Sequence, residues 1–296
     1  MPTQLYVAHE TTYHYASRVD LAQHLAWLEP VSQPWQQLES CALTITPEPA
    51  YLSRVTDYFG NTQHRFSITA PHDALCVKAE SVVSLSPRFT NVDPAASPAW
   101  EAVRAAMHFQ VGMPFAPESE FAYPSPFVPL LRQLHDYALA SFMPERPLLD
   151  AVLELMHRIH REFTYAAAST EVSTPVLEAF NARMGVCQDF AHIMIGCLRA
   201  LGLPARYVSG YLLTDPPPGQ PRLLGADASH AWLSVWCPVH GWVDLDPTND
   251  VVPTCAHVVV AVGRDYGDVT PLRGVIQGGR DHTLDVAVSV LPLGGV

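Results

Sequence analysis

The segment RMGVCQDFAH, residues 183–192, places a cysteine where a helix is expected to begin. Gly185 can make the close turn before such a helix, so Cys187 lies in its first turn. Free backbone N–H groups and the helix dipole at this end favour a thiolate and an oxyanion forming beside the sulfur. Asp189 can accept from the same N–H groups and compete with the thiolate for the dipole. The alternative is a small buried apolar residue, which we expect for Cys197 in mid-helix.

A thiolate nucleophile needs a base, and His230 is the best-placed histidine. It opens the predicted strand SHAWLSVWCP after a polar segment at residues 215–229. A histidine in that position lies at the rim of a sheet, where it can reach a neighbouring helix end, although a solvated strand-edge histidine would fit as well. His192 is closer to Cys187 in sequence, but it is well over a turn away and is expected to pack or cap.

The base in turn needs a group that orients it, and a predicted hairpin brings Asp246 to His230. The strands SHAWLSVWC and GWVDLDP are joined by the short loop PVHG, so the start of the first pairs with the end of the second. Pro247 ends the second strand directly after Asp246. Asp244 shares the same strand face and is the alternative orienting group.

Zinc binding is the competing interpretation of these residue types. Cys237 and His240 have a C-x2-H spacing, and Cys255 and His257 are the only other close pair. A structural zinc site needs four ligands, usually from two such pairs, and the second pair here lies in a strand-like segment. We therefore expect no metal and no cofactor.

The elements that must position these residues lie between residues 147 and 296. Apolar residues of PLLDAVLELMHRIHREFTY fall on one helical stripe, and CQDFAHIMIGCLRALG is a strongly apolar helix. The pattern then changes to a period of two through five predicted strands. Helices followed by consecutive strands predict an α+β core with helices packed on an antiparallel sheet.

The first half of the chain has a different character. Residues 1–90 are rich in β-branched and aromatic residues, with Gly60-Asn61 suited to a tight turn, and they predict an N-terminal β-sandwich domain. Residues 91–146 form a helical and Pro-rich connecting segment. Residues 147–296 are then the core together with the C-terminal strands.

The composition excludes some classes of partner. The chain has 29 acidic and 17 basic residues and a formal charge of -12, so we expect neither nucleic acid nor an anionic membrane as a partner. No apolar run is long enough to span a membrane, and the N-terminus has no signal-peptide pattern. Six scattered cysteines without a CxxC pair favour free thiols and a cytoplasmic location.

Four segments in order, GVCQDFAH, LRALGLPARYVSGYL, SHAWLSVW and GWVDLDPTN, resemble the transglutaminase-like superfamily, which shares its core with papain-like cysteine peptidases. The N-terminal segment also resembles the β domain that precedes the core in bacterial members. The resemblance implies a nucleophile at Cys187, a general base at His230 and an orienting residue at Asp246. No acidic loop resembles the calcium sites of the animal enzymes.

The resemblance also suggests residues around the triad. An aromatic residue upstream of the cysteine can donate to an oxyanion in this family, and Tyr165 is the candidate, although it could equally be a packing residue. Asp189 is a further candidate beside the nucleophile. The segment GRDYGDVTP resembles a loop near the active site, so Arg264, Asp265 and Tyr266 either line the cleft or hold two strand ends together.

Three functions fit these features. The first is a thiol enzyme that attacks an amide of a peptide or protein substrate and hydrolyses the thioester acyl-enzyme. The second is transglutaminase-type acyl transfer, in which an amine replaces water. The third is a non-catalytic protein-binding module, against which the intact triad counts. We favour hydrolysis because water is always available in the cytosol; the oligomeric state does not follow from the sequence.

Overall fold

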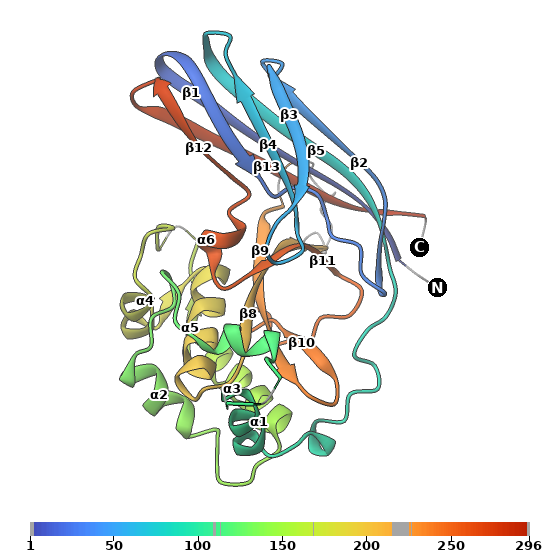
Figure 1. Ribbon diagram of the computed structural model, residues 1–296, viewed down its shortest axis with the longest axis vertical. Coiled ribbons are helices and arrows are strands. Elements are labelled where there is room, and N and C mark those ends of the chain that lie inside the picture. Colours follow the sequence, from blue (N-terminus) through green and yellow to red (C-terminus); the bar gives the residue numbers. More distant parts are fainter. Residues whose placement is uncertain are drawn as a thin grey trace, which may run out of the picture.

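The computed structural model describes residues 3–108, 111–112, 114–167, 169–214, 225 and 227–294. It has two parts (Figure 1): a large curled antiparallel sheet, near which both chain ends lie, and an α+β core in which helices pack against a four-stranded sheet. Most of the polar segment expected at 215–229 lies outside the described residues. Within the described part of the chain, no helix is long and apolar enough to cross a membrane.

The large sheet is organised around β1 (Thr3–Ala26), which pairs along nearly its whole length. Its first half lies between β5 and β13, and its second half lies between β4 and β12. Because one strand belongs to both halves, the sheet curls and encloses a small apolar core that includes Val19, Ile68 and Val77. The other strands are β2 (Gln36–Thr46), β3 (Tyr51–Thr56), β4 (Thr62–Ile68), β5 (His72–Leu85), β12 (Leu272–Gly278) and β13 (His282–Leu293).

The last two strands correct the expected domain organisation. Residues 147–296 were predicted to form one unit with the C-terminal strands, but β12 and β13 pair with β1 in the N-terminal sheet. They run end to end along one side of β1, from the Ala26–Leu272 pair to the Gln4–Leu293 pair. The reason is the length of β1, whose side opposite β4 and β5 needs a partner for its backbone hydrogen bonds.

The helices of the core surround α5 (Cys187–Ala200). Every residue of α5 from Gln188 to Arg199 is buried, because the helix packs between the sheet strands β8 and β9 and the helices α2, α3 and α4. The remaining helices are α1 (Trp100–Met107), α2 (Arg132–Leu139), α3 (Leu148–Glu162), α4 (Val176–Ala182) and α6 (Tyr266–Val269).

The core sheet has the order β10-β9-β8-β11, and its strands are β8 (Ala205–Leu212), β9 (Ser229–Cys237), β10 (Gly241–Leu245) and β11 (His257–Gly263). All neighbours are antiparallel, so β9 and β11 begin at the edge where β10 ends. The predicted hairpin between β9 and β10 is present, with Gly241 opposite Cys237. Gly210 in β8 is required, because a Cβ there would lie 2.0 Å from the carbonyl oxygen of Val258. The ends of β8 and β10 and the beginnings of β9 and β11 therefore meet at one edge of this sheet.

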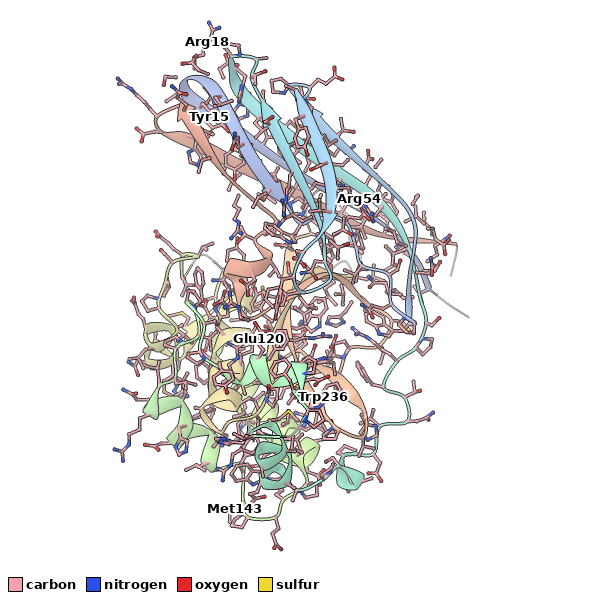
Figure 2. All side chains as sticks on the ribbon, viewed as in Figure 1. Tyr15, Arg18, Arg54, Glu120, Met143 and Trp236 are labelled. Carbon is pink, nitrogen blue, oxygen red and sulfur yellow. The ribbon has the colours of Figure 1, made fainter. Side chains whose placement is uncertain are left out.

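Two amide side chains from the N-terminal part attach it to the core. Gln36 donates to the carbonyl of Val259 at 2.7 Å and accepts from its N–H at 2.8 Å. Asn61 makes the same pair of bonds with Val262, both at 2.8 Å. Glu120, at the boundary between the two parts in Figure 2, accepts a further hydrogen bond from Tyr58 at 2.7 Å. The amides satisfy the free backbone groups of the edge strand β11, so the two parts have a defined relative position.

Candidate active site

The N-terminus of α5 is held by Asp189, the third residue of the helix. Its Oδ2 accepts from the backbone N–H of Val186 at 2.8 Å and from the hydroxyl of Thr170 at 2.6 Å. Gly185 makes room for this carboxylate, because a Cβ at that position would lie 2.6 Å from it. The first turn is thereby fixed, and Cys187 is presented there, half-buried, beside first-turn N–H groups that can stabilise an anion.

We expect Asp189→Ala to lower the free energy of unfolding by about 1–2 kcal/mol, because two buried hydrogen bonds at the helix start are lost. Urea unfolding followed by circular dichroism measures this change. Asp150→Ala is the matched control, since Asp150 is the acidic residue in the first turn of α3, and it should cost under about 1 kcal/mol. An equal loss in both variants would mean that Asp189 acts only through the helix dipole.

His230 and Asp246 are brought together at the edge of the core sheet. His230 Nε2 donates to Asp246 Oδ2 at 2.7 Å, and the imidazole is also a hydrogen-bond partner of the Cys187 side chain. Since Nε2 is engaged by the carboxylate, Nδ1 is the nitrogen left for the sulfur. The Trp232 ring stacks on the imidazole, with centroids 5.8 Å apart, and fixes its plane. The three residues thus form a Cys–His–carboxylate chain.

The electrostatics of this chain favour a charged imidazole. Burial lowers the pKa of His230, but the hydrogen bonds to Asp246 and Cys187 outweigh burial and raise that pKa to about 10. For Asp246, burial raises the pKa, but the hydrogen bonds from His230, His257 and Asn249 and the charge of His230 together outweigh burial and leave the pKa well below its ordinary value. At neutral pH the pair is therefore an imidazolium and a carboxylate, and the positive charge lies next to the sulfur.

Sequence reasoning missed two further partners of Asp246. His257, the first residue of β11, donates to Oδ2 at 3.0 Å, and the Asn249 side chain donates to the same oxygen at 2.7 Å. Backbone N–H groups of Thr248 and Asn249 donate to Oδ1 at 3.0 and 3.2 Å. The sequence does place His257 at the start of a predicted strand. This position indicates a contact with Asp246 only when β11 is known to begin at the same edge of the sheet as β9. Asp246 is completely buried and held by five donors, so it is rigid.

His230, Asp246 and His257 are also the only group among the described residues with the geometry of metal ligands, with ligand atoms within 4.8 Å of one another. Three protein ligands suit a catalytic zinc ion. Here both imidazoles already donate to the carboxylate at 2.7 and 3.0 Å, so the group is complete as a hydrogen-bond network. Within the described chain, Cys237, His240 and Cys255 belong to no such group.

Cys187 and His230 open into a cavity of about 400 Å³. Tyr165 lies on its wall and is 54% exposed, and burial together with the nearby Cys187 raises the pKa of its hydroxyl. The other described residues of its lining are Leu212, Thr214, Asp227, Ala228, Ser229, Thr248 and Asn249. Of the residues suggested around the triad, Tyr165 is the one that faces this space.

Asp189, Arg264 and Tyr266 do not line the cavity. Asp189 is buried under the helix start, and Arg264 forms an ion pair with Asp268, with both donor distances 2.9 Å. The backbone N–H of Tyr266 donates to Nε2 of His192 at 3.2 Å. Arg264 and Tyr266 therefore hold elements together, which was the alternative interpretation of this segment.

The other sequence alternatives have structural partners away from the thiol. His192 is buried and stacked on Phe127, and burial lowers its pKa to about 3, so it is a neutral packing residue. Asp244 accepts from Trp232 at 2.9 Å and from Ser234 at 2.6 Å rather than from His230. Asp265 accepts from the backbone N–H of Phe127 at 2.9 Å and caps α6.

A helix-borne thiol, a strand-borne histidine and a buried carboxylate on an α+β core define the class of Cys–His–Asp thiol sites. Comparison with known proteins agrees with this class. Residues 5–84 match the bacterial transglutaminase-like N-terminal region, and residues 137–247 match the transglutaminase-like superfamily. An uncharacterized protein of Mycobacterium tuberculosis is 43% identical over 98% of this chain and 93% of its own length. The chain belongs to the transglutaminase-like superfamily.

Two further relatives describe the range of the family. A protein-glutamine gamma-glutamyltransferase of Pseudomonas aeruginosa is 32% identical, over 42% of this chain and 19% of that enzyme. A crystal structure from Cytophaga hutchinsonii, described provisionally as a cysteine protease, superposes with a TM-score of 0.75 at 19% identity and covers 100% of this chain and 92% of that one. The latter similarity extends over both parts of the molecule and establishes the fold.

Proposed function

We propose that the protein is a thiol enzyme that acts on amide bonds of peptides or proteins through Cys187, His230 and Asp246. The observation that carries the proposal is the continuous chain from the Asp246 carboxylate through the His230 imidazole to the Cys187 side chain, which opens into a cavity. Membership of a superfamily of cysteine proteases and transglutaminases supports an enzyme of this kind.

Each residue has one role in the proposed reaction. The Cys187 sulfur attacks the amide carbonyl carbon, while first-turn N–H groups of α5 and the Tyr165 hydroxyl are available to the oxyanion. The C–N bond breaks as the His230 imidazolium gives its proton to the leaving amine, and a thioester remains on Cys187. Water then attacks the thioester, His230 takes its proton, and the carboxylic acid leaves with the thiol restored. Asp246 holds the imidazole in position throughout.

Hydrolysis is our first choice because the cavity is open to solvent and contains the exposed residues Ser229 and Asn249. Water therefore has access to the thioester. The second candidate is transfer of the acyl group to an amine, which the similarity to a protein-glutamine gamma-glutamyltransferase favours. The two reactions share the acyl-enzyme and differ only in the acceptor that enters the cavity.

Trapping of the acyl-enzyme from a peptide library tests the proposal and separates the two reactions. We expect mass spectrometry to find an acyl adduct on Cys187 and none on the Cys187→Ala variant. Free acid as the product, with or without an added primary amine, indicates hydrolysis; an amine-conjugated product indicates acyl transfer. An absence of both adduct and product with every peptide would contradict an amide-directed enzyme and favour a binding module.

A further inference from the structure

A second cavity, of about 320 Å³, lies between the N-terminal part and the core. Loops that contain Trp35, Phe59 and Arg88 contribute one side, and strands β8 and β10 contribute Arg206 and Asp244 to the other. Among the described residues, the linings of this cavity and of the cavity at Cys187 have no member in common. Interfaces between domains are common positions for small-molecule sites.

Arg88 is the central polar residue of this second cavity. Its side chain is 4% exposed, and its Nη1 contacts Asp244 Oδ2 at 2.7 Å. Its Nε and Nη2 have no hydrogen-bond partner among the described residues. The guanidinium carbon Cζ lies over the Trp35 ring, 3.7 Å from the ring centroid. Phe89, the next residue, has a positive φ of 59°, a conformation that a bulky side chain rarely adopts and that tends to occur at functional sites. Donor groups of a fixed arginine therefore remain without an acceptor.

The charges around Arg88 leave an excess of positive charge. Arg206 lies in a row with Ser234 and Asp244 across β8, β9 and β10, so two guanidinium groups share one carboxylate among the described lining residues. The Asp244 carboxylate accepts hydrogen bonds from Trp232 and Ser234 in addition to its ion pair with Arg88. The Arg206 guanidinium lies over the Trp242 ring, 4.4 Å from its centroid, and its Nε donates to Ser234 at 3.4 Å. Burial lowers the pKa of Arg206 to about 10.

A further polar atom of the lining, on His240, could also contact a ligand that has acceptor oxygens. Nε2 of His240 is buried and, in the described structure, lacks a hydrogen-bond partner. The apolar side chains of Val31, Phe59 and Val262 also line the cavity. A ligand that fits these surroundings has acceptor oxygens and negative charge for the guanidinium groups and an apolar body for these side chains.

We propose that this second cavity binds a small organic oxyanion, with a carboxylate or phosphate group on Arg88 and Arg206 and an apolar body against Val31, Phe59 and Val262. Guanidinium groups recognise both oxyanions through paired N–H donors. The site is separate from the catalytic cavity, so occupancy does not require a free Cys187.

Calorimetric titration in a Tris–chloride buffer tests this site with three probes: benzoate, inorganic phosphate and the neutral analogue benzamide. We expect saturable one-to-one binding of at least one anion, none of benzamide, and the same affinity after Cys187 has been alkylated. Tighter binding of benzoate identifies a carboxylate with an apolar body, and tighter binding of phosphate identifies a phosphate group. Arg88→Gln and Arg206→Gln should each weaken binding by about tenfold or more.

Arg18→Gln is the matched control, because it removes the same charge at the far tip of the N-terminal sheet (Figure 2), and it should leave the affinity unchanged. Arg206→Gln keeps the buried Arg88–Asp244 ion pair and is expected to fold. If Arg88→Gln does not fold, the affinity of Arg206→Gln tests the site. The proposal is overturned by a lack of saturable binding of both anions, by loss of binding after alkylation of Cys187, or by an equal effect of Arg18→Gln.

Discussion

Replacing His230 by alanine is expected to slow acyl-enzyme formation by at least about 10⁴-fold and to end the preferential alkylation of Cys187. In the wild-type protein the charged imidazole lies next to the sulfur, and it is also the acid that protonates the leaving amine. Iodoacetamide labelling at about pH 6, followed by peptide mapping, measures the first effect. Cys187 should react faster than the half-buried Cys41, Cys76 and Cys255 in the wild type, and at a comparable rate in the variant.

Another histidine–carboxylate pair provides the control. His157 on α3 is hydrogen-bonded to Asp250 in a more exposed position, and neither residue lines the cavity. His157→Ala should leave both the labelling of Cys187 and the acylation rate at wild-type values. Circular dichroism distinguishes loss of the base from unfolding. Selective labelling that persists in a folded His230→Ala protein would show that another group activates the thiol.

The contact between His230 and Asp246 could be predicted from sequence because it depends on a hairpin between two neighbouring strands. A short loop between two alternating strands predicts a hairpin, and the hairpin determines that the start of β9 lies near the end of β10. The contact between His230 and Asp246 follows directly. Asp244 could not be excluded in this way, because it shares the strand face with Asp246. One of its actual partners, Arg88, comes from a loop distant in sequence.

The part that could not be predicted depends on pairings between distant segments. β13 has the same period-two pattern as the core strands, and nothing in that pattern indicates that it pairs with β1, more than 240 residues earlier in the chain. His257 was missed for the same reason, since its position beside Asp246 depends on the order β10-β9-β8-β11. Strand order is a property of the whole sheet and is not encoded in any one strand.

We expect Asp246→Asn to lower the acylation rate by about 10³- to 10⁴-fold and to shift the titration of His230 downward. In the wild type the hydrogen bonds to Asp246 and Cys187 together outweigh burial and raise the pKa of His230 to about 10, so the imidazolium persists through neutral pH and is lost only as the pH rises through that value. A neutral amide removes the contribution of the carboxylate, whereas burial, which lowers the pKa, remains. The pKa of His230 should then fall from about 10 toward its ordinary value of 6.5, because only Cys187 still raises it.

NMR titration of histidine-labelled protein measures this shift of the His230 pKa directly. The titration also separates an electrostatic role of Asp246 from a structural one, because a structural role would leave the pKa of His230 unchanged in a folded variant. Asp250→Asn is the matched control: it makes the same change on the carboxylate that binds His157, at a residue with a positive φ of 56° that asparagine also tolerates. His230 should titrate in that control as in the wild type. An unchanged His230 titration in Asp246→Asn would mean that His230 draws its charge from the thiolate alone, and the role assigned to the buried carboxylate would be wrong.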